Sequence, residues 1–173
     1  MSDPAASTTS LAQGLLRFLR VGNLVFCAVI LGLGAWSFAY EGRLETYLAG
    51  LPVPRDPHVH LIGLRLLIVF GVVGVALVHR ILGGLLAIVG TVRQGDPFVP
   101  DNAVRLRHIA WLLLAGEVLH LAAGAFMNFW ESPSAPLEWS FSWTGWVAVV
   151  MLFTLAHVFA AGTRMREELE GTV

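Results

Sequence analysis

The sequence predicts an all-α membrane protein: a four-transmembrane-helix bundle with a long second helix and with both termini in the cytoplasm. Three observations lead to this prediction. The 173 residues are 56% hydrophobic and only 13% charged, about half the charged fraction of a soluble domain. Four apolar runs are long enough to span a bilayer. The basic residues lie mainly on one side of those runs. The net charge of −1 gives no reason to expect direct nucleic-acid binding.

The four runs are taken in order as the spans of a single membrane domain that covers residues 1–173. The expected spans are residues 21–40, 61–92, 109–130 and 143–162. Each contains about the 20 residues that cross the hydrocarbon core. The second is longer, and as a helix it would measure ~48 Å. We therefore expect its end to project beyond the lipid.

The arginines predict the orientation. All eleven basic residues are arginine. Eight fall in or beside the N-terminal tail, the second connection and the C-terminal tail, whereas two fall in the first connection and none in the third. The eight are Arg17, Arg20, Arg80, Arg93, Arg105, Arg107, Arg164 and Arg166. The positive-inside rule then places both termini in the cytoplasm, which in a bacterium makes this a multi-pass protein of the inner membrane.

The cytoplasmic hairpin connection, residues 93–108, contains clear helix-end signals. Gly95 suits the position just after a helix, and Pro97 cannot continue one. Asp101 or Asn102 is expected to cap the next helix. The simplest interpretation is a hairpin anchored at the lipid surface, followed at residues 163–173 by a solvated charged helix end. The functional alternative is a docking surface for a cytoplasmic partner or for anionic lipid. Its candidate residues are Asp96, Pro97, Phe98, Asn102, Arg105, Arg107, Arg164, Arg166, Glu167 and Glu168.

Two segments carry a family resemblance. "GDPFVPDNAVRLR" (95–107) and "VFAAGTRMREELEGTV" (158–173), with the spacing of the four spans, resemble a bacterial inner-membrane family described as domain of unknown function twenty-nine seventy-five. The resemblance implies four membrane helices and no established enzyme activity. Genes of this family are often neighbours of a Cro/C1-like helix-turn-helix regulator, which implies such a regulator as a cytoplasmic partner. The family often has an acidic residue where this chain has His157, so a carboxylate role there does not carry over.

Apart from Arg65 near the start of the second span, five charged or imidazole side chains lie within the spans, where such groups are costly. They are His79, Arg80, Glu117, His120 and His157, and we expect them to converge in the cytoplasmic half of the bundle. Three interpretations compete. Glu117 pairs with Arg80, a histidine or a carbonyl and locks the packing; two of His79, His120 and His157 ligate haem b or a metal; or the group forms a proton relay for sensing or transport, which in so small a chain would need a homo-oligomer.

Other chemistry finds little support. The sequence has no phosphate-binding loop, no nucleophile elbow and no arrangement of Cys and His for nucleophilic catalysis, so we do not expect an enzyme. His58 and His60 in the first connection offer two metal ligands, and two alone make a weak site. The sequence thus favours a regulatory or interaction protein that partners a cytoplasmic transcription-regulator-like protein. The alternatives are a haem- or metal-binding membrane subunit and a small proton-coupled transport or sensing protein.

Overall fold

The computed structural model describes residues 4–50, 57–130 and 141–170, and these residues form five helices. The helices are α1 (Pro4–Ala39), α2 (Glu41–Ala49), α3 (Pro57–Arg93), α4 (Pro100–Trp130) and α5 (Trp143–Glu170). Four are long and apolar enough to cross a membrane, whereas α2 is short. The all-α, four-span prediction is confirmed, and so is the long second membrane helix.

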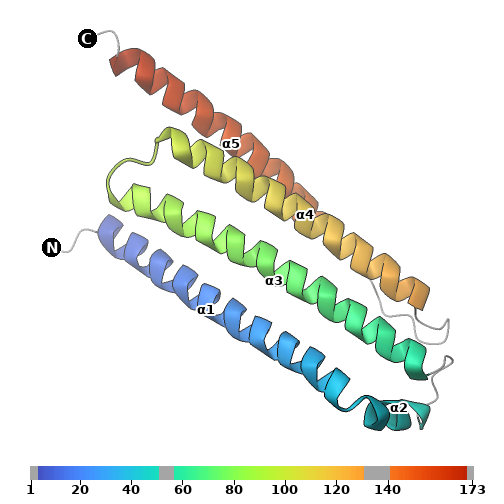
Figure 1. Cartoon of the computed structure of the whole chain (residues 1–173). Coiled ribbons are helices and arrows are strands. Elements are labelled where there is room, and N and C mark those ends of the chain that lie inside the picture. The colour runs from blue at the N-terminus through green and yellow to red at the C-terminus, as the bar shows by residue number, and fades with distance from the viewer. Residues whose placement is uncertain (1–3, 51–56, 131–140, 171–173) are drawn as a thin grey trace.

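The four long helices lie side by side in one row, in the order α1, α3, α4, α5 (Figure 1). Within the described residues, α1 packs against α3 and α2, α3 packs against α4, and α4 packs against α5. The bundle is therefore open, because α1 and α5 do not meet. Both termini lie at one end of the row, which we call the terminal end; α2 lies at the opposite end, the α2 end.

The helices extend further than the apolar runs that predicted them. The first was expected from residue 21 and begins at Pro4, and the third was expected from residue 109 and begins at Pro100. The fourth was expected to end at residue 162 and continues to Glu170. The reason is that hydrophobicity marks the part of a helix in lipid, whereas Arg, Glu, Gln and Met continue a helix into water without a propensity penalty.

Several of the best-buried residues lie where α4 packs against its neighbours in the terminal half of the row. Leu106, Ile109 and Ala110 on α4 are at most 5% exposed. Gly84 on α3 lets Ile109 approach so closely that an added Cβ would lie 3.0 Å from it. By contrast, most large apolar side chains of α1 are exposed, as expected for a helix that faces lipid.

Helix α5 is displaced toward the terminal end relative to α4. Glu117 of α4 lies against Gly145, the third residue of α5. Since α5 begins two residues before Gly145, about the last 11 residues of α4 continue for ~16 Å beyond the level at which α5 begins. The row is staggered as well as open.

Candidate functional site

The α3–α4 connection is a tightly hydrogen-bonded turn. The Gly95 N–H donates to the carbonyl of Val92 (3.1 Å) and the Asp96 N–H donates to that of Thr91 (3.2 Å). This pair of bonds is the Schellman motif, which requires a left-handed residue after the helix, and Gly95 has φ +86°. The predicted helix end at Gly95 is confirmed.

The predicted cap of the next helix is wrong. Helix α4 begins at Pro100, where the missing N–H costs nothing, so Asp101 and Asn102 lie inside it. Asn102 is fully buried, and its amide donates to Thr91 Oγ1 (2.6 Å) and to the carbonyl of Pro97 (2.9 Å). Its carbonyl oxygen accepts from Arg105 (2.9 Å). Asn102 therefore ties the turn to both flanking helices and does not face a partner.

The same turn is fastened to α5 by a group of residues that we call the clasp: Asp96, Phe98, Phe159, Gly162 and Arg166. Arg166 donates to Asp96 at 2.5 Å. The Phe98 ring stacks on Phe159 with centroids 5.4 Å apart and lies against Gly162. Predicted docking residues thus bind each other within the chain.

A groove of about 460 Å³ runs between α4 and α5 at the terminal end. It is lined by Pro100, Ala103, Val104, Arg107, Phe153, Ala156, His157, Ala160, Thr163, Arg164 and Glu167. Three predicted docking residues, Arg107, Arg164 and Glu167, therefore lie together on one surface. The others lie elsewhere: Arg105 pairs with Asp101 (3.3 Å), and Glu168 is on the exposed last turns of α5. The groove lies between α4 and α5, whereas the clasp joins the α3–α4 turn to α5.

A family comparison covers all of these elements. Residues 36–173 match the family described as "Protein of unknown function (DUF2975)". The chain belongs to this family. The resemblance noted from the two sequence segments is confirmed, and in this DUF2975 protein those segments are the ones that the clasp joins. No curated protein and no solved structure matches the chain.

The structure does not bring the predicted intramembrane cluster together in this DUF2975 protein. His79 accepts from Arg20 of α1 (Nη2 to Nε2, 3.1 Å), and Arg80 is exposed on α3. His157 lines the groove, and His120 is exposed on α4. The helices are distributed in a row, so these side chains fall on different helix pairs. Sequence depth alone could not show which faces would meet.

His79 and His157, two of the candidate haem ligands, are also separated along the helix axes. Gly84 of α3 meets Ile109 of α4. Trp111, also on α4, meets Phe153 of α5. His79 lies five residues from Gly84 toward the α2 end, and His157 lies four residues from Phe153 toward the terminal end. Because Trp111 lies two residues from Ile109 toward the α2 end, the difference is ~10 Å, and α4 stands between them. The fold thus does not place them as two axial ligands of one haem.

Glu117 does not form the polar lock that we expected as the simplest interpretation. Its Oε2 is buried and has no hydrogen-bond partner among the described residues. Its Oε1 occupies the space beside Gly145, so close that a Cβ there would collide with it. The lack of a side chain at Gly145 is what admits the carboxyl group.

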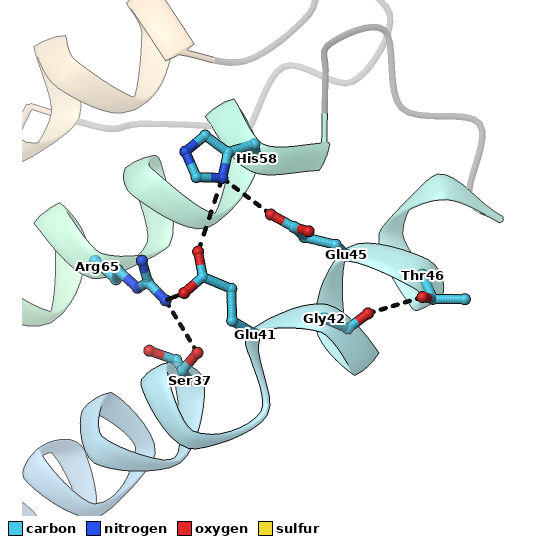
Figure 2. Close-up of polar contacts among 7 residues, drawn as sticks. All are labelled: Ser37, Glu41, Gly42, Glu45, Thr46, His58 and Arg65. Atoms are coloured by element: carbon cyan, nitrogen blue, oxygen red, sulfur yellow. Dashed lines mark hydrogen bonds and ion pairs between the residues drawn. The ribbon is translucent and has the colours of Figure 1, made fainter.

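A second polar site, at the α2 end, combines His58, one of the two histidines noted in the first connection, with Glu41 and Glu45, which the sequence analysis did not connect with it. Figure 2 shows Glu41 and Glu45 of α2 pointing toward His58 at the start of α3. His58 Nδ1 lies 2.9 Å from Glu45 Oε1 and 3.7 Å from Glu41 Oε1, and Arg65 pairs with Glu41 at 3.2 Å. The spacing of Glu41 and Glu45, one helical turn apart, was the available signal. Their approach to His58 depends on how the chain returns from α2.

Proposed function

We propose that this chain is a multi-pass protein of the bacterial inner membrane that binds a cytoplasmic regulatory protein in the α4–α5 groove. It would act as a binding protein and not as an enzyme. The observation that carries the proposal is the groove itself, which combines an apolar floor with a charged rim beside the clasp. The family resemblance suggests a regulator of the helix-turn-helix class as the partner that would bind in this groove.

The lining residues indicate what the partner presents. Phe153, Ala156 and Ala160 supply apolar surface, whereas Arg107 and Arg164 supply two permanent positive charges. Glu167 is the one acidic residue among the groove's lining. The complementary ligand is a helix or extended segment with an apolar anchor side chain flanked by carboxylates.

The orientation in the membrane follows from the positive-inside rule. Arg93, Arg105, Arg107, Arg164 and Arg166 all belong to the helix ends and the turn at the terminal end. That end then faces the cytoplasm, and so does the charged end of the groove, with Arg107, Arg164 and Glu167. Fusions of cytoplasmic and periplasmic reporters to both termini test this orientation, and a periplasmic terminus would overturn it.

The binding proposal is tested by purifying the full chain from native membranes in mild detergent and identifying retained proteins by mass spectrometry. We expect one cytoplasmic protein to be retained at a fixed molar ratio to the chain. The same partner, once purified, should bind the chain again. The variant Arg107→Gln/Arg164→Gln, and separately Ala160→Trp, which fills the floor, should lose most of that binding.

Arg17→Gln is the matched control, because Arg17 is an exposed arginine in the terminal half of α1 and lies outside the groove. It should retain the partner. Equal binding by the groove variants and by the unaltered chain would contradict the proposal, and so would the absence of any specifically retained cytoplasmic protein.

A further inference from the structure

We propose that Glu41, Glu45 and His58 form a binding site for one divalent transition-metal ion, with Zn²⁺ as the best-fitting ion. This site lies at the α2 end and is separate from the proposed partner groove. It joins α2 to α3, which pack against each other although α2 buries none of its residues.

The ligand atoms already surround a position for an ion. One oxygen of each glutamate and one nitrogen of His58 all lie within 4.8 Å of one another. Zn–N and Zn–O bonds of 2.0–2.2 Å in a tetrahedral site place ligand atoms ~3.4 Å apart. The observed separations from His58 Nδ1, 2.9 Å to Glu45 and 3.7 Å to Glu41, lie on either side of that value. Small side-chain rotations therefore suffice.

Arg65 orients one of the ligands. Its guanidinium binds Glu41 Oε2 at 3.2 Å and leaves Oε1 directed toward His58 (Figure 2). Arg65 is itself held by the Ser37 carbonyl at 3.0 Å and by the Phe38 ring at 3.9 Å. Partners that hold a metal ligand in this way raise affinity by restricting its orientation.

The donor set selects the class of ion. One imidazole and two carboxylates suit Zn²⁺ with a fourth position for water, whereas Ca²⁺ and Mg²⁺ prefer oxygen ligands alone. The side chains of His58, Glu41 and Glu45 are 58%, 38% and 36% exposed, so an ion can reach them. On binding, the proton on Nδ1 moves to Nε2 or leaves to solvent, because the coordinating nitrogen has to be unprotonated.

The test is isothermal titration of ZnCl₂ into the full-length protein in detergent, after dialysis against a chelator. We expect saturable binding of one ion per chain and a higher unfolding temperature with Zn²⁺. Glu45→Gln and His58→Gln should each weaken binding by at least tenfold, and Arg65→Gln should weaken it by about 10–100-fold, as for other residues that orient a ligand.

His60→Gln is the matched control, because it removes a neighbouring imidazole from the same helix end. It should bind Zn²⁺ like the unaltered chain. Circular dichroism of each variant shows whether it still folds. If His58→Gln does not fold, Glu45→Gln provides the test of the site. Absent or non-saturable binding by the folded protein would overturn the proposal, and so would loss in His60→Gln with retention in Glu45→Gln.

Discussion

At the scale of the residue, Asn102 organises the α3–α4 turn. Its side chain is 0% exposed and bonds to Thr91, Pro97 and Arg105. Thr91 in turn donates to the Ile88 carbonyl, so the polar groups of the buried turn form one connected network. Removing a member leaves buried donors or acceptors unpaired, which costs more than the bond itself contributed.

We therefore expect Asn102→Ala to lower the free energy of unfolding by about 1–3 kcal/mol. Unfolding in SDS measured by circular dichroism checks this value. Asp101→Ala is the control: its side chain is 76% exposed, so its effect should stay within ~0.5 kcal/mol. Equal effects at the two positions would contradict the network described here.

For Glu117 we expect the opposite behaviour. The unpartnered Oε2 is costly in its charged form, because a buried charge without a partner loses its hydration. Glu117→Gln should therefore leave the free energy of unfolding unchanged or raise it. A clear decrease in the same SDS titration would show that the carboxylate is a packing lock after all.

The structural role of a residue was predictable only where it depends on its neighbours in the sequence. Gly95 was correctly placed after a helix because its signal lies within three residues. Asn102 is of a residue type that often caps helices. Because α4 already begins at Pro100, Asn102 lies inside the helix and its amide points inward. Glu41 and His58 come from helices separated by a connection, so no sequence pattern fixed their distance.

At the scale of the element, the turn depends on the left-handed backbone of Gly95. A side chain there costs roughly 1–2 kcal/mol. We expect Gly95→Ala to destabilise the fold by about that amount. Gly90→Ala, in the interior of α3 and with nothing within 4 Å of an added Cβ, should be neutral or stabilising by up to ~1 kcal/mol. Thermal unfolding in detergent compares the two variants.

The existence of each long helix was predictable, but its ends and its neighbours were not. An apolar run of about 20 residues needs a helix in lipid because every backbone polar group has to be satisfied. The same argument says nothing about where the helix stops in water or which helix lies beside it. The polar-cluster prediction failed for this reason, since it assumed a closed bundle.

At the scale of the whole molecule, the open row is directly testable by cross-linking cysteines in a Cys27→Ser background. Gly74→Cys with Leu119→Cys should link within one chain, because α3 and α4 are in contact there. Gly22→Cys with Val147→Cys should not, because α1 and α5 are three interhelical spacings apart, ~25–30 Å. Mass spectrometry of the linked peptides measures both, and an efficient α1–α5 link within a chain would indicate a closed bundle.

The stagger of the row has a consequence for how the protein sits in a bilayer. The middle of the apolar run of α1 lies near Ile30, which meets Gly71 of α3. The middle of the run of α5 lies near Phe153, which meets Trp111 of α4, two residues from the Ile109 that meets Gly84. The two heights differ by ~17 Å along the axes and by three helix spacings across the row. Both runs enter the hydrocarbon together only when the helices lean by roughly 30° in the plane of the row, within the range seen for membrane helices. Bilayer thickness then sets the lean, and the lean sets how far the charged end of α5 stands out of the lipid.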